Sequence, residues 1–160
     1  MGPRSGNIDP SVMIYLMERY GDAQKVSDIV HKQAGLLGVS GISSDLRDVE
    51  EAAANGNERA KIAQDILITG VKQYIGSFAA EMGGVDVVVF TAGIGENAPE
   101  MRAGLCKRLA WMGVKIDPEK NAVRSDEPRV ISTDDSAITV MVVPTNEEYM
   151  IALDVEELLG

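Results

Sequence analysis

The sequence has little cysteine and few aromatic residues: one cysteine, one histidine and 4% aromatic side chains among 160 residues. The single cysteine, Cys106, excludes an internal disulfide, and we expect a buried thiol in a reducing compartment. No grouping of histidine and cysteine has the spacing of a zinc site. A disulfide scaffold and a zinc-binding domain are therefore excluded.

Long apolar runs are also missing. The longest run without a charged residue, Gln33 to Ser44, has twelve residues, whereas a membrane-spanning helix needs ~20 apolar residues. The first residues lack the apolar region of a secretion signal. We therefore expect no membrane partner and a cytoplasmic protein.

Basic residues are scarce, with 15 against 25 acidic residues and a net charge of -10. Such a chain repels the phosphate backbone of nucleic acid, which we exclude as a partner. Hydrophobic residues make up 45% of the sequence, enough for one domain that buries ~70% of the surface of its unfolded chain. We therefore expect a single domain over residues 1–160.

The first half of the chain is predicted to be helical. Asp9-Pro10 is typical of a helix start and Gly21 of a helix end. Further helices are expected over Lys25–Gln33, from a cap at Ser44 or Asp45 to Gly56, and over Glu58–Met82 with one buried apolar stripe. The glycine-rich segment from Ala34 to Ser44 is expected to be a packed loop.

The second half alternates strands with helices. Val85 to Thr91 is predicted to be a strand covered on both faces, followed by a helix from Pro99 to Met112. Further strands are expected at Val114–Ile116, Arg129–Ser132 and Ile138–Val143, and Pro144 to Glu147 leads into a last helix. The order predicts an α/β fold with a mixed, mostly parallel sheet flanked by helices.

One motif points to a nucleotide. Gly93-x-Gly95-x-x-Ala98 follows a predicted strand and opens a helix, and Asp117 lies at about the ~20-residue offset of the ribose-binding acid in dinucleotide folds. This pattern favours an NAD-binding domain. Against it, Glu96 puts a carboxylate where pyrophosphate would bind, and a long helical region precedes the strand that should come first.

A second interpretation comes from a resemblance. The stretch Val88-Val-Phe-Thr-Ala-Gly-Ile-Gly-Glu-Asn97 resembles Val-Phe-Thr-Gly-Gly-Ile-Gly-Glu-Asn of acetate kinases. Met1-Gly-Pro-Arg-Ser-Gly-Asn-Ile-Asp-Pro10, Ser43-Ser-Asp-Leu-Arg-Asp48 and Val143-Pro-Thr-Asn-Glu-Glu148 resemble three more segments of that family, in the same order. The four matches extend over nearly the whole chain.

The resemblance implies the C-terminal part of an acetate kinase, without the N-terminal domain. Acetate kinases have the actin-like ATPase fold, related to ribonuclease H, in which two domains close around ATP or ADP. The implied activity is phosphoryl transfer between ATP and acetate or another short carboxylate, with Mg²⁺ as cofactor. The part seen here is expected to have little activity alone, and family members form homodimers through this region.

The resemblance also assigns candidate site residues. Arg4 matches a catalytic arginine that stabilises charge on the transferred phosphoryl group. The nucleotide-contacting positions are Asp45, Leu46, Arg47, Gly93, Ile94, Gly95, Glu96 and Asn97. The last five are expected to form a turn that lets the backbone approach the adenosine part of ATP. Glu147 matches the acid near Mg²⁺, with Glu148 as the alternative if the register is shifted by one.

Two positions depart from the family pattern, because Pro3 replaces threonine and Ala92 replaces the first glycine of a pair. Neither change removes a charged group. Three hypotheses therefore stand: part of an acetate kinase, an NAD-binding domain, or a dimerisation piece without a ligand.

Overall fold

The computed structural model describes residues 2–159 in two compact units, and the division falls inside one long helix, between Val71 and Lys72. Each unit has its own buried core, and each is described by itself. The single domain expected over residues 1–160 stays a prediction.

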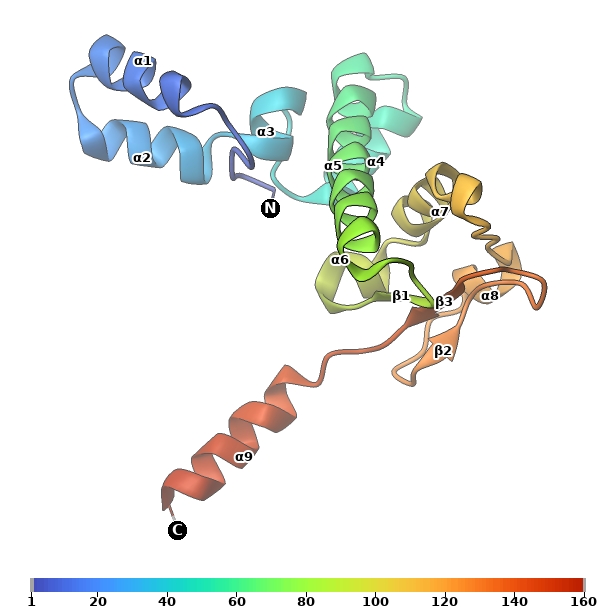
Figure 1. Cartoon of the computed structure of the whole chain (residues 1–160). Coiled ribbons are helices and arrows are strands. Elements are labelled where there is room, and N and C mark those ends of the chain that lie inside the picture. The colour runs from blue at the N-terminus through green and yellow to red at the C-terminus, as the bar shows by residue number, and fades with distance from the viewer. Residues whose placement is uncertain (1, 160) are drawn as a thin grey trace. The chain divides into compact units, whose positions relative to one another are not determined.

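The first unit is helical (Figure 1). Its elements are α1 (Pro10–Tyr20), α2 (Ala23–Lys32), α3 (Gly35–Ser40), α4 (Leu46–Ala54) and the first part of α5 (Glu58–Met82). The bounds predicted for α1 are confirmed, since the Asp9 side chain accepts a hydrogen bond from the Ser11 N–H and Gly21 ends the helix with a φ of 63°. Asp22 caps α2 in the same way.

The loop expected between Ala34 and Ser44 is wrong in part, because α3 occupies six of its residues. This short helix buries Leu36 and Ser40 and ends at Gly41, whose φ is 70°. The apolar residues of the segment therefore serve the core of the unit. That core is formed by Val26, Val30, Leu36, Leu46, Val49, Ala53, Ala60 and Ala63.

Helix α5 has the predicted bounds, but its predicted buried stripe is wrong. Only Ala60 and Ala63 are buried along it. A row of large apolar side chains at four-residue steps is exposed instead, and it continues past Gly70: Ile62, Ile66, Tyr74, Phe78 and Met82. The periodicity indicates a helix face correctly, but it does not show whether a partner element covers that face.

The second unit contains a three-stranded mixed sheet in the order β1-β3-β2 (Figure 1). Strand β1 (Val87–Phe90) runs parallel to β3 (Thr139–Val142), and β2 (Arg129–Val130) runs antiparallel to it. Val88 lies opposite Val140, and Phe90 lies opposite Val142. The mixed sheet agrees with the predicted class, but residues 114–116 contribute only one isolated bridge, between Ile116 and Ser132.

One face of the sheet is buried and the other is exposed. Side chains alternate along a strand, so Phe90, Val140 and Val142 lie in the core while Val87 and Val89 of β1 are 46% and 51% exposed. The expectation that this strand is covered on both faces is therefore wrong for the described part of the chain.

Four helices and a 3-10 turn complete the described part of this unit: α6 (Ala92–Asn97), α7 (Pro99–Arg108), η1 (Ala110–Met112), α8 (Pro118–Ala122) and α9 (Glu147–Leu159). Helix α7 buries Met101, Leu105 and Cys106. The core position predicted for Cys106 is confirmed, and burial raises the pKa of its thiol to about 11.

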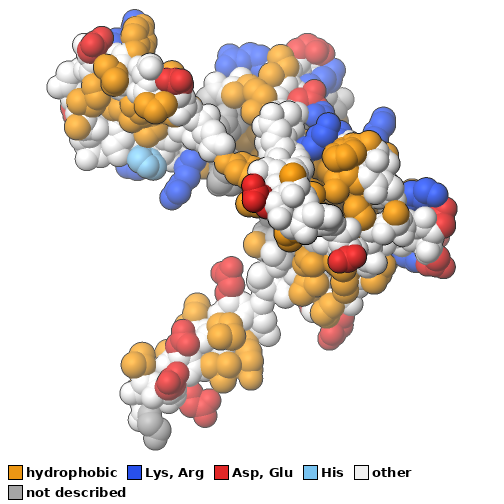
Figure 2. All heavy atoms as spheres, viewed as in Figure 1, with side chains coloured by type: hydrophobic (Ala, Val, Ile, Leu, Met, Phe, Trp, Pro, Cys, Tyr) orange, Lys and Arg blue, Asp and Glu red, His pale blue; other side chains and the backbone are white. Residues whose placement is uncertain are grey.

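Helix α9 buries none of its described side chains, although it carries apolar residues such as Ile151 and Leu158. Figure 2 shows apolar side chains gathered along it, at the lower end of the view. Among residues 2–159, no helix combines the length and the apolar character needed to cross a membrane.

Candidate functional site

The segment that carries Arg4 is fixed by its backbone. Ser5 N donates to the Val30 carbonyl at 2.8 Å, and the Pro3 carbonyl accepts from Ala34 N at 2.9 Å. These bonds hold the segment against the end of α2 and the start of α3. The Arg4 side chain itself is exposed.

Gly2 brings this segment against the residues that precede α4. Gly2 is buried, and a Cβ atom added to it would overlap the carbonyl oxygen of Ser44. The two main chains are therefore in direct contact, and Arg4 lies two residues from this contact while Asp45 lies one residue from it. Gly2 lies inside the matched segment Met1–Pro10, but the close approach to Ser44 that requires a glycine there is seen only in the structure.

Asp45 and Arg47 form a local charged pair at the start of α4. Asp45 Oδ1 accepts from the Arg47 backbone N–H at 2.9 Å and from Arg47 Nε at 3.0 Å. The predicted helix cap is thus confirmed. The hydrogen bonds from the Arg47 side chain and backbone lower the Asp45 pKa to about 2.

The residue between them, Leu46, is 7% exposed and anchors the first turn of α4 in the core. Arg47 is exposed. The charged ends of this segment are therefore accessible while its middle residue holds the segment in place.

Gly93 to Asn97, expected to form a turn, belong to the short helix α6 directly after β1. Gly95 is buried, and a Cβ there would lie 3.2 Å from the carbonyl carbon of Phe90. Gly93 is exposed, and a Cβ there would meet nothing within 4 Å. Packing thus explains the glycine at position 95 but not the glycine at position 93.

Ala92 begins this helix with a φ of 58°, in the left-handed region. A residue with a Cβ is disfavoured there by roughly 1–2 kcal/mol, whereas glycine is not. The resembling family pattern has glycine at this position. Ala92, which replaces the family's glycine, therefore has a strained backbone conformation.

Glu96 contacts the segment that precedes α9. Its Oε1 accepts from the Thr145 backbone N–H at 2.8 Å and from the Thr145 hydroxyl at 3.0 Å. The backbone N–H of Thr145 is the main cause that lowers the Glu96 pKa. This carboxylate links α6 to the chain two residues before Glu147.

Glu147 and Glu148 are exposed residues in the first turn of α9. Asn146 accepts through Oδ1 from the Tyr149 N–H at 3.1 Å and so fixes that turn. Within residues 2–159, no group of three or more histidine, cysteine, aspartate or glutamate side chains could hold a metal ion. A single carboxylate still suits Mg²⁺, which usually keeps several waters and binds phosphate oxygens.

A buried arginine that the sequence did not single out lies beneath α6. Arg102 is 1% exposed and donates from Nη1 to the carbonyls of Gly95 and Glu96, at 2.9 Å and 2.8 Å. The sequence signal was its position at helical spacing among the buried residues of α7, between Met101 and Leu105. An arginine in such a stripe is more often expected to point to solvent.

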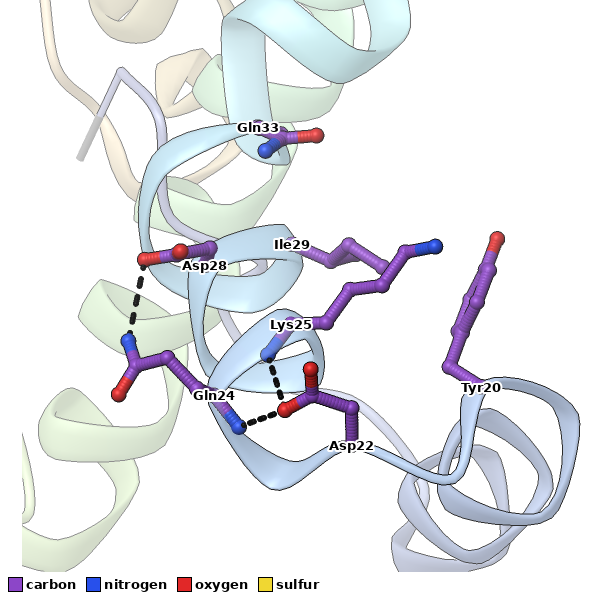
Figure 3. A pocket seen from close by; sticks show the side chains of 7 residues that line it. All are labelled: Tyr20, Asp22, Gln24, Lys25, Asp28, Ile29 and Gln33. Atoms are coloured by element: carbon purple, nitrogen blue, oxygen red, sulfur yellow. Dashed lines mark hydrogen bonds between the residues drawn. The ribbon is translucent and has the colours of Figure 1, made fainter.

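A shallow surface hollow of about 560 Å³ lies elsewhere, between the end of α1 and helix α2 (Figure 3). It contains none of the predicted site residues. Asp22 accepts there from the backbone N–H groups of Gln24 and Lys25, and Gln24 Nε2 donates to Asp28 at 3.4 Å. These polar groups serve helix capping and local pairing.

The predicted residues thus gather in two places. Arg4 and the segment Asp45–Arg47 lie on touching segments of the first unit. The segment Gly93–Asn97 and Glu147 are linked in the second unit through Glu96 and Thr145. Their roles toward nucleotide and metal stay predictions.

Comparison with known proteins gives consistent matches. A family described as the Acetokinase family matches residues 1–153. The acetate kinase of Thermoanaerobacter pseudethanolicus is 55% identical over 99% of this chain and 40% of its own length. A crystal structure of Porphyromonas gingivalis acetate kinase has a TM-score of 0.88 at 48% identity, covering all of this chain and 40% of that chain.

A propionate kinase from Francisella tularensis is also similar, with a TM-score of 0.85 at 39% identity over 95% of this chain and 38% of its own. The chain therefore spans about two-fifths of the length of the relatives it matches. These structures confirm the predicted fold class, α/β of the actin-like ATPase type.

The NAD-binding alternative finds no support in these matches. The structure also argues against an NAD-binding domain, since the strand that should end at Asp117 is not formed. Asp117 instead caps α8 by accepting from the backbone N–H groups of Glu119 and Lys120.

Proposed function

Because the chain belongs to the acetokinase family, we propose that it supplies the adenosine-binding part of an acetate kinase. The reaction transfers a phosphoryl group between ATP and acetate or another short carboxylate. A carboxylate oxygen forms a bond to the γ-phosphorus while the bond to the oxygen of ADP breaks. The products are an acyl phosphate and ADP.

Two anions approach each other in this reaction, so positive charge must offset the charge on the transferred group. The exposed guanidinium of Arg4, on its fixed backbone segment, is proposed for this role. Mg²⁺ would supply further positive charge at the phosphates when bound, and Glu147 is the carboxylate proposed to hold it.

The nucleotide contacts are assigned to the start of α4 and to the short helix α6. Asp45 and Arg47 offer an acceptor and a planar cation to the ribose or base, and Leu46 holds them in place. The residues Gly93, Ile94, Gly95, Glu96 and Asn97 place the backbone of α6 beside the adenosine. Asn97 Nδ2 donates to the Gly93 carbonyl at 3.0 Å and so keeps this short helix closed.

The observation that carries the proposal is the open space at Gly93. Its side-chain position is free of protein atoms, although alanine would favour the helix by roughly 0.5–1 kcal/mol over glycine. The fold therefore gives no steric reason for glycine here. A ligand that approaches the backbone closely at this position would supply a steric reason for glycine.

The test is calorimetric titration with Mg·ADP of the chain and of its Gly93→Ala variant. Gly76→Ala is the matched control, because Gly76 in α5 also has no protein atom within 4 Å of an added Cβ. We expect both variants to fold, and only Gly93→Ala to lose affinity, by about tenfold or more, the equivalent of ~1.4 kcal/mol.

Binding tests the proposal better than turnover does, because the chain spans about two-fifths of the length of its relatives and is expected to have little activity alone. Equal affinity of Gly93→Ala and the unsubstituted chain would contradict the assignment of α6. Binding of NAD⁺ in place of Mg·ADP would contradict the proposed activity.

We also propose that the protein acts as a homodimer in the cytoplasm. The exposed apolar row on α5 supports the dimer, and the buried thiol of Cys106 supports a reducing compartment. Sedimentation velocity at micromolar concentration should show a dimer that Ile66→Asp weakens. Asn55→Asp adds the same charge at an exposed polar position outside α5 and should leave the dimer intact, whereas a monomeric unsubstituted chain would exclude the dimer.

A further inference from the structure

Arg102 places a positive charge in the interior of the second unit. Burying a charge is costly unless it is hydrogen-bonded, and burial lowers the pKa of this guanidinium. Arg102 donates to four uncharged oxygens, two on α6 and two on Asn121. A leucine or methionine would fill the same space without this requirement. The arginine is therefore explained by the specific arrangement of its hydrogen bonds and not by packing.

The acceptors on α6 are its last carbonyls. Gly95 and Glu96 lie at the C-terminal end of this helix, where carbonyl groups lack helical partners and a positive charge is favoured. The planar guanidinium takes both carbonyls through one nitrogen. The single nitrogen of a lysine could not bond both carbonyls of α6 and also reach the acceptors on α8.

Asn121 holds the other side of the guanidinium. Its Oδ1 accepts from Arg102 Nε at 2.8 Å and its carbonyl accepts from Nη2 at 2.7 Å. Asn121 is itself fixed, since Nδ2 donates to the Pro99 carbonyl at 2.9 Å. The network therefore ties α6, α7 and α8 together at one buried point.

We propose that Arg102 is a positioning residue for nucleotide binding, which acts by fixing α6 so that Gly93 presents its backbone to the ligand. This inference rests on the proposed function. A site that relies on close backbone approach tolerates little displacement, because shifts of about 1 Å can remove most of its contribution.

The experiment compares Arg102→Lys and Arg102→Gln with Leu109→Ala in the same chain. Leu109 is 1% exposed and follows the last turn of α7, so its truncation destabilises the same core without removing a bond to α6. Urea unfolding gives the stability of each variant, and titration with Mg·ADP is done where each is fully folded. Hydrogen exchange of the amides of residues 95–98 reports the order of α6 without any ligand.

We expect Arg102→Lys and Arg102→Gln to lose at least tenfold in Mg·ADP affinity and to exchange these amides at least tenfold faster. Leu109→Ala should change both by less than threefold when folded.

Equal losses of affinity in the Arg102 variants and Leu109→Ala, or unchanged exchange of the α6 amides, would overturn the positioning role alone. If the unsubstituted chain binds no Mg·ADP, the proposed function fails, and the nucleotide role of Arg102 fails with it. The first result is seen in the variants and the second in the unsubstituted chain, so the two failures are distinct.

Discussion

The two segments assigned to the nucleotide, the start of α4 and helix α6, are held by different forces. The side chains of Asp45 and Arg47 at α4 hold each other through a charged pair that is open to solvent, on a turn that the buried Leu46 anchors. The α6 segment is fixed from beneath by the buried network of Arg102 and Asn121. Exposed ion pairs contribute little and weaken with salt, whereas a buried polar network is costly to break. We infer an adjustable contact at α4 and a rigid platform at α6.

The largest expected effect comes from breaking the buried hydrogen-bond network that supports α6. Asn121→Ala removes the Oδ1 acceptor of Arg102 Nε and the donor to the Pro99 carbonyl, so the buried Nε of Arg102 loses its partner. We expect a loss of about 2–3 kcal/mol in the free energy of unfolding. Urea unfolding measures this loss.

Cys106 provides a second readout of the same change. Its thiol is buried and is the only one in the chain, so labelling by a thiol reagent reports opening of this unit. Asn121→Ala should speed labelling at pH 8, while Asn55→Ala at an exposed position should not. Unchanged stability and labelling in Asn121→Ala would show that the buried network does not support α6.

A change of smaller size and opposite sign tests the start of α6. Ala92→Gly relieves the left-handed strain, partly offset by the greater freedom of glycine in the unfolded chain, and should raise stability by about 0.5–1 kcal/mol. Ala80→Gly, inside α5, is the control and should lower stability by about 1 kcal/mol. Thermal unfolding that shows the same sign for both variants would contradict the φ of 58° at Ala92.

Substitutions in the exposed Asp45–Arg47 pair should lower the stability less. Asp45→Ala removes the cap of α4 together with its charged partner, whereas Asp45→Asn keeps a good capping side chain. We expect a lower melting temperature for the alanine variant than for the asparagine variant, and a smaller loss in both than in Asn121→Ala. A larger loss in Asp45→Asn than in Asn121→Ala would reverse our ranking of the two segments.

The sequence predicted features that depend on neighbouring residues. Asp9-Pro10 and Gly21 set the ends of α1, Asp45 was one of two caps expected for α4, and the bounds of α5 follow from its apolar period. The motif from Gly93 to Asn97 was placed correctly after a strand, but its helical form was not foreseen.

The predictions that were wrong concern burial, which depends on the elements that pack against a residue and not on its neighbours in the sequence. The exposed row of α5 and the open face of β1 have the same apolar pattern as buried ones, so periodicity cannot separate them. Arg102 was missed because a charged side chain is normally expected at the surface. Its acceptors on α6 and α8 come together only when α7 packs between the two.

The smallest expected effect is the response of the α4 pair to acid. The Asp45 pKa of about 2 lies below the unfolded value of about 3.9. Its stabilising contribution is therefore complete above about pH 4 and is lost as the pH falls toward 2. NMR titration of the Asp45 carboxyl group should give this low midpoint. Arg47→Gln removes the side-chain hydrogen bonds that are its main cause, and should raise the midpoint toward the ordinary value. A midpoint near 4 in the unsubstituted chain would mean that the pair does not persist in solution, and that α6 alone is held in a fixed position.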